Sequence, residues 1–419
     1  MTRPFPCTTR TLSNGLRIYL IHKPGFVKSL FLCGFGAGGA NIQEMQDGTL
    51  YKNPSGCAHF LEHQMFRLNG QDVTDAMSAM SASCNAFTAY DETAYYFTTS
   101  ADPLPPLGLL LDFVQTLDIT DQTVEKEKGI ILSEYRMYDQ SPDSRLMTET
   151  LRSLYTFDPL NTDILGTPQD IRNMTRQDLE RFYAINYDPS KMILVGVTGR
   201  DPQEILDFVE KHEKAYPQKN TVQSVPWHEP EPAAVHRKTH TLQLDVSAPY
   251  ACVGFKLRPA GTPMENAKRD LIFNIWLDGT FSPLNPDYQT WLDERIITQT
   301  CGAEADLTST HAYALFYAQS EKPRQFMDLA IRLAQEKKRL DPDTFEVLRR
   351  QNIASTIRLR DQFYALASQQ LEAALHHVDF SEVMELPAKI TYEDMTAVLD
   401  SLDFSEFTET VINPLKTES

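Results

Sequence analysis

The chain has 419 residues and carries 57 acidic against 39 basic side chains, a formal net charge of −18. Its length suggests two to three domains, and its 42% hydrophobic and 23% charged residues are typical of a globular protein. The acidic balance argues against a nucleic-acid partner and against an anionic membrane surface, because both need a surplus of Lys and Arg. The six cysteines are scattered without a Cys-x-x-Cys pair, which favours reduced thiols over disulfides or a zinc knuckle.

The apolar runs are short. Stretches such as Leu107–Leu111 and Met192–Val197 are far below the ~20 residues that span a bilayer. Residues 1–10 lack the apolar core of a signal peptide. We therefore expect a cytoplasmic protein with no membrane partner.

The first half of the chain predicts strands alternating with helices. The expected strands are Leu16–His22, Ser29–Phe35, a pair within Asn85–Thr99, and Met192–Val197. The expected helices are Ala58–Phe66, Val73–Met80, Leu104–Leu117, Thr123–Tyr138 and Arg176–Ala184.

Four prolines within a polar stretch predict a linker at residues 217–235. After it, strands are expected at His240–Asp245, Ala251–Leu257 and Phe407–Ile412, and helices at Glu265–Leu277, Pro323–Arg339, Thr344–Ala374 and Tyr392–Leu402. Because strands followed by helices occur in both halves, the order suggests a duplicated α+β unit. We expect domains at residues 1–216 and 236–419.

The clearest chemical motif is His59-Phe60-Leu61-Glu62-His63. Residues four apart on an α-helix point the same way, so both imidazoles can reach one zinc ion. Glu62 lies on the same side and can take a proton from a zinc-bound water. H-x-x-E-H is the inverzincin arrangement, although a helix with an exposed polar face is the alternative.

Zinc needs a third protein ligand, and the acidic run Val124–Tyr135 is the best candidate region. Glu127 and Glu134 are seven residues apart and share one helix face. One could bind the metal while the other orients a ligand, or both could belong to a solvated face with Glu–Lys pairs. Spacing alone does not choose between the acidic residues.

Four stretches together resemble the pitrilysin/insulinase family of zinc peptidases, and especially its processing-peptidase branch with the YmfH-like bacterial members. They are Gly56–Phe66, Asn85–Thr88 with Glu92–Tyr96, Glu125–Asp139, and Ile164–Thr167 through Phe182-Tyr183 to Tyr187–Pro189. The resemblance implies two similar pitrilysin-like α/β-sandwich domains, each a mostly antiparallel sheet with helices packed on it, joined by the Pro-rich linker. The second domain lacks the zinc motif.

The resemblance also implies the roles of individual residues. The family's Zn²⁺ ligands fall on His59, His63 and Glu134, its general base falls on Glu62, and its helper carboxylate falls on Glu127. The expected activity is that of a zinc metalloendopeptidase, in which Glu62 activates zinc-bound water for attack on the scissile carbonyl of a peptide or unfolded segment.

The family's substrate-binding edge strand falls on Asn85, Ala86 and Phe87. An extended peptide would pair with this strand through main-chain hydrogen bonds, while side-chain pockets set the preference. Asn85 would contact the substrate backbone, and Phe87 would help to wall a pocket near the scissile bond.

One feature departs from the active relatives that this sequence resembles. They carry an Arg and a Tyr in the second half, where this chain has Leu292–Thr300, with Asp293 at the Arg position and no Tyr; Arg295 is out of register. The resemblance therefore implies a heterodimer, whose homologous partner lacks the zinc motif and supplies the pair. The alternative is a non-catalytic structural or binding subunit of such a heterodimer.

Two further motifs match the patterns of a dinucleotide site and a metal site, but we interpret both as structural. Gly34–Gly39 fits G-x-G-x-x-G, but the residues after it predict no helix, which a dinucleotide site requires. His236 and His240 are four apart in a strand-like segment, where the imidazoles would lie ~13 Å apart and could not share a metal.

Overall fold

The structure, a computed structural model, describes residues 6–218, 222 and 224–415. The backbone contacts separate two compact units. The first contains the described residues of Met1–Tyr135, Thr162–His228 and Leu359–Phe380, and the second contains those of Arg136–Asn161, Glu229–Arg358 and Ser381–Ser419. Each unit thus includes a segment from the other half of the chain. The domain boundaries expected at residues 216 and 236 stay a prediction.

The first unit is built on a six-stranded sheet in the order β1-β2-β10-β3-β9-β8. Its strands are β1 Cys7–Thr11, β2 Arg17–His22, β3 Ser29–Phe35, β8 Ala82–Thr88, β9 Thr93–Thr99 and β10 Met192–Thr198. Neighbours are antiparallel, except that β2 and β10 run parallel. The apolar strands β3 and β10 are buried along their whole length, because they lie in the middle of the sheet.

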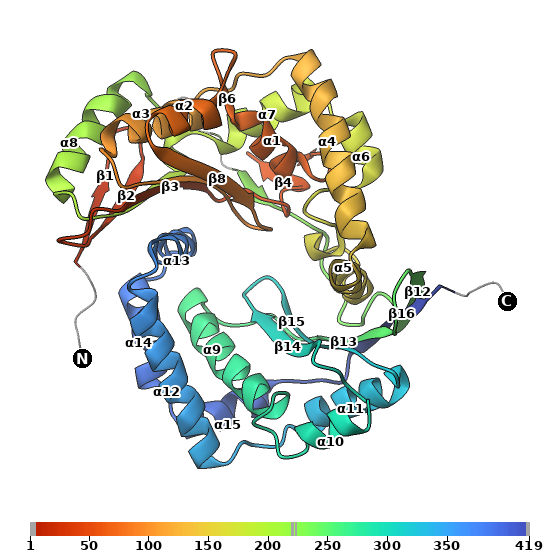
Figure 1. The fold of residues 1–419 in the computed structure, drawn as a ribbon. Helices are drawn as coiled ribbons and strands as arrows, with labels where there is room; N and C mark the ends of the chain where they lie inside the picture. The colour runs from red at the N-terminus through yellow and green to blue at the C-terminus, as the bar shows by residue number, and fades with distance from the viewer. Residues whose placement is uncertain (1–5, 219–221, 223, 416–419) are drawn as a thin grey trace. The chain divides into compact units, whose positions relative to one another are not determined.

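Helices cover both faces of this sheet (Figure 1). The helices of this unit are α1 Cys57–Met65, α2 Val73–Ala79, α3 Leu104–Val114, α4 Asp121–Gln140, α6 Pro168–Asn173, α7 Arg176–Asn186, α8 Pro202–His212 and α13 Phe363–Leu375. Figure 1 shows α1, α2 and α3 on one face and α13 on the other, where α13 contacts β3 and β10. Leu371 of α13 fills the space that a Cβ at Gly34 would need, so a glycine in β3 allows the close approach.

Short elements complete the first unit. Two small sheets contain β4 Gln43–Gln46, β5 Thr49–Lys52 and β11 Ser224–Pro226, and β6 Arg67–Leu68 with β7 Gln71–Asp72. Single 3₁₀ turns are η2 Pro189–Lys191 and η3 Glu213–Ala215. Strand β11 falls inside the predicted linker and pairs with β4, while residues 219–221 and 223 of that linker lie outside the described residues.

The second unit repeats this design. Its sheet has the order β12-β16-β13-β15-β14, formed by β12 Thr239–Leu244, β13 Tyr250–Lys256, β14 Cys301–Leu307, β15 Ala312–Gln319 and β16 Phe407–Pro414. Only β12 and β16 are parallel, so the sheet matches β2-β10-β3-β9-β8 strand for strand. The prediction of two similar domains, each a mostly antiparallel sheet with packed helices, is confirmed.

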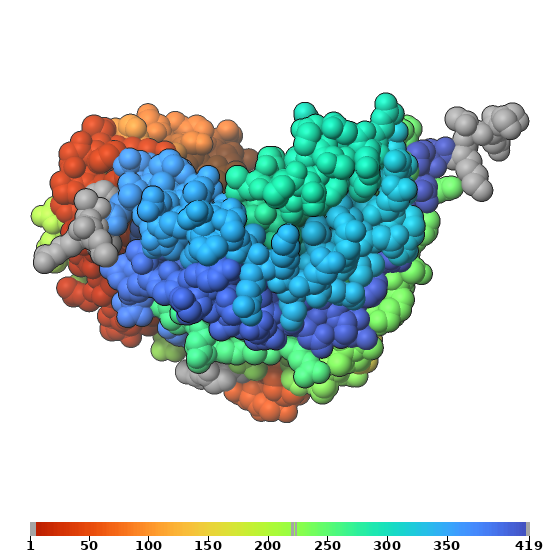
Figure 2. All heavy atoms as spheres, turned by 90° about the horizontal axis from the view of Figure 1, so that it is seen from below, coloured from red at the N-terminus to blue at the C-terminus, as the bar shows by residue number. Residues whose placement is uncertain are grey.

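The helices of the second unit also cover both faces of their sheet. They are α5 Pro142–Leu154, α9 Pro263–Thr280, α10 Tyr288–Asp293, α11 Pro323–Glu336, α12 Pro342–Leu359, α14 Phe380–Lys389 and α15 Tyr392–Ser401, with η1 Pro159–Asn161. Helix α5 contacts β13 and β16, and α9 and α11 lie on the other face (Figure 1). In the space-filling view, much of the surface facing the reader consists of atoms coloured teal to blue, the colours of the later part of the chain (Figure 2).

One predicted helix is wrong. The stretch Thr344–Ala374 was expected to be continuous, but α12 ends at Leu359 and α13 begins at Phe363. The buried ammonium of Lys23 donates to the carbonyl of Arg360, and its Nζ lies 4.8 Å from the ring centre of Phe363. These tertiary contacts stabilise the break, since the sequence there contains neither Gly nor Pro.

The six cysteines are free thiols, as expected. Among the described residues, none of the helices combines the length and the apolar character that crossing a membrane requires.

Candidate metal centre

Helix α1 is short and held in place by its apolar side. Phe60, Leu61 and Met65 are buried in the core of the first unit. Gly56 precedes the helix with φ +79°, and a Cβ there would lie 2.1 Å from the carbonyl oxygen of Leu165. The glycine therefore permits the sharp entry into α1, and the packing fixes the direction in which its polar side chains point.

One side of helix α4 carries both apolar and acidic residues. Val124 and Ile131 are its buried residues, and Glu127 and Glu134 follow each of them by three positions. Residues at these spacings share one side of a helix. The apolar pair anchors α4 on the core, so both carboxylates are held beside α1.

The structure brings His59, His63 and Glu134 together. The Nε2 atoms of His59 and His63 lie 3.7 Å and 3.5 Å from Oε2 of Glu134. One ligand atom from each residue lies within 4.8 Å of the other two. Tetrahedral zinc with bonds of ~2.1 Å separates its ligand atoms by roughly 3.4 Å, so the three residues fit such an ion. No other group of three His, Cys, Asp or Glu residues converges in this way within the described part of the chain.

The surroundings shift the pKa values of the two imidazoles in opposite directions. Burial, together with the neighbouring His63, lowers the pKa of His59 to about 3. Burial opposes protonation of His63 as well, but the hydrogen bond to Glu127 and the charges of Glu62 and Glu134 raise its pKa. His59 is therefore neutral at pH 7, the form that binds a metal, whereas a metal binding to His63 competes with a proton.

Glu127 orients His63. Its Oε1 lies 2.9 Å from Nδ1 of His63, which leaves Nε2 facing Glu134. A carboxylate on the second ring nitrogen fixes the tautomer of a metal-binding histidine. His59 has no such support: its Nδ1 is buried without a hydrogen-bond partner among the described residues.

Glu62 lies beside this group in a largely buried position. The hydroxyl of Thr88 on β8 donates to its Oε2 at 2.5 Å. Burial raises the pKa of Glu62, while the Thr88 hydrogen bond and the charge of His63 act in the opposite direction. A raised pKa brings a carboxylate closer to the working pH of a general base.

The predicted substrate strand is an edge strand. Within the described residues, β8 pairs only with β9, so its other side offers backbone N–H and C=O groups to an added strand. Asn85 is exposed, and its Oδ1 accepts from the backbone N–H of Ala86. The ring of Phe87 lies 6.3 Å from that of Tyr364 on α13. The substrate-binding roles of Asn85, Ala86 and Phe87 stay a prediction.

Neither the glycine-rich loop Gly34–Gly39 nor the pair His236 and His240 has the geometry of a binding site. No helix follows the loop Gly34–Gly39; the next element is β4, and a Cβ at Gly38 would lie 2.4 Å from the carbonyl of Ala89. The loop glycine thus serves a close backbone approach. His240 lies in β12, as expected, with its Nε2 3.1 Å from Oε2 of the buried Glu149.

Sequence reasoning missed some residues around Glu62. Thr88 was part of the recognised strand, but no role was assigned to its hydroxyl. The hydroxyls of Tyr95 and Tyr187 lie 2.9 Å apart, and the negative charge of Glu62 contributes to the raised pKa of both phenols. The only signal was strand alternation, which places Thr88 on the same face of β8 as Ala86.

The residues expected to stand in place of the Arg/Tyr pair lie in the second unit, and the loss of that pair stays a prediction. Asp293 ends α10, and its Oδ1 accepts from the side chain of Gln289. Arg295 has φ +59°, and its Nη1 lies 3.0 Å from both carboxylate oxygens of Glu321. The nearby arginine is therefore paired within its own unit.

Family models and curated relatives of the insulinase type match this chain. The sequence model "Insulinase (Peptidase family M16)" matches residues 45–168, and the "Peptidase M16 inactive domain" model matches residues 173–353. The uncharacterised zinc protease YmfH of Bacillus subtilis is 29% identical over 93% of this chain and 92% of its own length. The mitochondrial-processing peptidase subunit beta of Lentinula edodes is 27% identical over 49% of this chain and 45% of its own.

Solved structures show a similar likeness. The crystal structure of an M16-like peptidase from Alicyclobacillus acidocaldarius superposes with a TM-score of 0.93 at 29% identity, covering 99% of this chain and all of the other. A protease from Helicobacter pylori has a TM-score of 0.84 over 98% of this chain at 18% identity, which is a likeness of fold.

Proposed function

Because this chain belongs to the insulinase family of peptidases, M16, we propose that it is the zinc-bearing subunit of an endopeptidase that hydrolyses peptides or unfolded segments. One observation carries the proposal: His59, His63 and Glu134 converge from two helices, and Glu62 lies next to them. Two imidazoles and a carboxylate form a ligand set of the kind that catalytic zinc sites use. The cytoplasmic location stays a prediction.

The donor set fits zinc in chemistry and in spacing. His59, His63 and Glu134 would hold Zn²⁺, and Glu127 would keep the His63 ring in place through the hydrogen bond to its Nδ1. When bound, the ion would supply a Lewis acid for the scissile carbonyl and lower the pKa of a coordinated water.

The chain's own residues supply the remaining functions. Glu62 would accept a proton from the attacking water and later pass it to the leaving amine. Thr88 holds one carboxylate oxygen of Glu62, which leaves the other for the proton. The free side of β8 would bind the substrate backbone as an added strand, next to the strand residue that contacts Glu62.

The test is Glu62→Gln, assayed on a denatured protein substrate with the partner subunit present. We expect cleavage to fall by at least ~100-fold, because the amide cannot accept the proton. The zinc content of the variant should equal that of the wild type, since Glu62 is not among the three ligands. Near-normal turnover by Glu62→Gln would show that the base is another residue, and loss of zinc would show that Glu62 is a ligand.

We also propose that the active form is a heterodimer. The motivating observation is the absence of an Arg/Tyr pair in Leu292–Thr300, with Arg295 paired to Glu321 instead. The mitochondrial-processing relative is named as a beta subunit, which supports paired subunits. The alternative, a non-catalytic binding subunit, is disfavoured because the three ligands and Glu62 are all present and placed together.

A further inference from the structure

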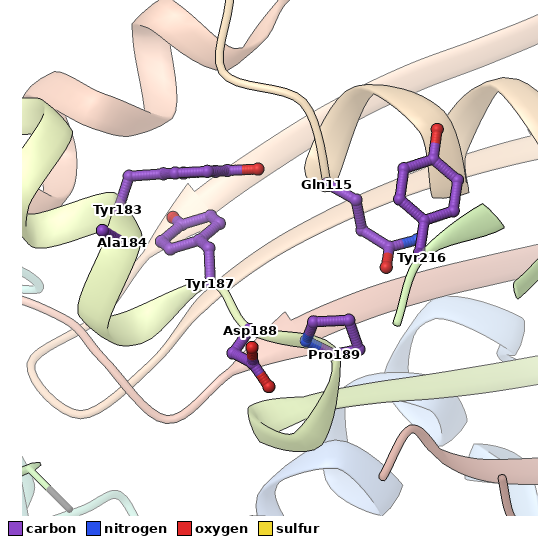
Figure 3. Close-up of a pocket in the computed structure, with 7 residues that line it drawn as sticks. All are labelled: Gln115, Tyr183, Ala184, Tyr187, Asp188, Pro189 and Tyr216. Atoms are coloured by element: carbon purple, nitrogen blue, oxygen red, sulfur yellow. The ribbon is translucent and has the colours of Figure 1, made fainter. Parts of the chain in front are cut away.

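A cavity of about 330 Å³ lies in the first unit, among elements that the proposed chemistry does not use (Figure 3). It is bordered by the end of α3, the end of α7 and the residue after η3. Its volume is at the lower end of the range typical of small-molecule sites, roughly 300–1,000 Å³. Exposed Ala184 on α7 stands at the wall of this cavity and gives a position from which it can be filled.

Gln115 lines this cavity, and its side-chain amide oxygen has no hydrogen-bond partner among the described residues. Its side chain is buried, with 6% of the residue exposed. Its Nε2 donates to the carbonyl of Leu111 and to Oε1 of Glu213, each at 2.9 Å. Since both partners are acceptors, they fix which end of the amide is nitrogen. The amide oxygen is buried without a hydrogen-bond partner among the described residues, and Figure 3 shows it turned toward Pro189.

The carboxylate of Asp188 is a second acceptor at the cavity. Oδ1 of Asp188 accepts hydrogen bonds from the backbone N–H and the hydroxyl of Ser190, which favour the ionised carboxylate. The hydroxyl of Tyr216 donates to Oδ1 of Asp112 at 2.6 Å and is also hydrogen-bonded by the Thr116 side chain, so Tyr216 borders the cavity with its ring. A ligand that satisfies the unpaired amide oxygen of Gln115 must bring an N–H or O–H donor.

The walls of the cavity are aromatic. The rings of Tyr183 and Tyr187 stack with their centres 5.1 Å apart, and Tyr187 stacks in turn on Phe35 at 4.1 Å. Tyr187 is thus stacked between two rings and can offer a ligand only its edge, whereas Tyr183 has no second aromatic partner among the described residues, so its other face can take a planar body and attract a cation. A positive charge would also be favoured by Asp188.

From these contacts we infer that the cavity is a binding site for a small organic cation, an amine or amidine with N–H donors on an aromatic or apolar body. The donors bond to the amide oxygen of Gln115 and to the carboxylate of Asp188, and the body lies against Tyr183 and Tyr187. This site is separate from the metal ligands, so it stands or falls independently of the peptidase assignment.

Tryptamine is a suitable probe, with 3-ethylindole as its neutral counterpart of similar shape. Calorimetry on the full-length chain should give saturable binding of tryptamine that is at least about tenfold tighter than that of 3-ethylindole. Ala184→Phe, which fills the cavity from its exposed wall, should weaken tryptamine binding at least about tenfold. Gln177→Phe, an exposed substitution earlier on α7, is the matched control and should leave binding unchanged.

Gln115→Met tests the acceptor, because it keeps the length of the side chain and removes the amide oxygen. It should weaken tryptamine and leave 3-ethylindole unaffected. Equal affinity for the two probes, no saturable binding of tryptamine, or undiminished binding in Ala184→Phe would overturn the proposal. A folding defect in Gln115→Met does not rescue it, because Ala184→Phe changes an exposed position.

Discussion

Glu127 and Glu134 are two turns apart on one helix, yet they reach different atoms. Glu134 lies 3.5–3.7 Å from the Nε2 atoms of both histidines, whereas Glu127 lies 2.9 Å from Nδ1 of His63. The seven-residue spacing placed both on one face without distinguishing them. Glu134 therefore meets both Nε2 atoms, and Glu127 meets the opposite nitrogen of one ring.

This difference leads to a test at the scale of one residue. Glu127→Ala should weaken zinc binding by about 10–100-fold, because His63 loses the partner that fixes its tautomer and orientation. Glu125→Ala is the matched control: Glu125 is exposed and paired with Lys128, and zinc binding should not change. Competition with a chelating dye measures both variants. Equal affinity of Glu127→Ala and the wild type would contradict the positioning role.

At the scale of one element, α1 depends on its entry. Gly56 combines φ +79° with backbone atoms of Leu165 and Gly166 where a side chain would have to go. The helix has no side-chain hydrogen bond at its N-cap, so its position depends on this close approach and on its buried residues. Any shift of α1 moves both histidines relative to α4.

We therefore expect Gly56→Ala to destabilise the protein by more than ~1 kcal/mol and to reduce zinc retention. Gly129→Ala is the control within the same unit. Gly129 is exposed in the middle of α4, and an added Cβ meets no atom within 4 Å. That substitution should stabilise the helix by ~0.5–1 kcal/mol. Thermal unfolding and metal analysis measure both, and an unchanged melting temperature for Gly56→Ala would refute the argument.

The strands of the two sheets differ in how well their own residues predict them. The fully apolar strands β3 and β10 were both predicted, because continuous burial leaves a continuous apolar run. Two strands of the second sheet were missed. The inner strand β15, Ala312–Gln319, is mostly buried, yet it was not predicted. In the edge strand β14, Cys301–Leu307, six of the seven residues are half-buried, and the sequence mixes charged with small residues. At the edge of a sheet, pairing with the neighbouring strand decides the conformation more than the pattern does.

At the scale of the whole molecule, the same sheet topology occurs twice. Each sheet is covered on one face by a helix, α13 or α5, that comes from the other half of the chain. The chemistry is not duplicated with the topology, since the second half carries neither the zinc motif nor the Arg/Tyr pair of the active relatives that it resembles. The duplication thus explains the fold, while the missing pair motivates a second subunit.

The isolated chain should consequently bind zinc and cleave poorly. Gel filtration establishes its oligomeric state, and turnover of a denatured protein substrate is compared with and without a homologous subunit that carries the Arg/Tyr pair. We expect addition of that subunit to raise turnover by at least about tenfold, because stabilising groups in the transition state each contribute at this scale or more. Robust turnover by the chain alone would rule out the requirement.

The sequence by itself determined the ligand candidates, most strands of the two large sheets and most helices, and the duplicated class of fold. Histidines at positions 59 and 63 share a helix face by helical geometry alone, and continuous apolar runs such as Met192–Val197 indicated two of the buried strands. Spacing left the two carboxylates equivalent, and the resemblance assigned Glu134 as the ligand. Only the tertiary structure decided which ring nitrogens each carboxylate faces, where Thr88 contacts Glu62, and that the helix expected at 344–374 breaks after Leu359. These features depend on contacts between residues far apart in the chain, which local periodicity does not encode.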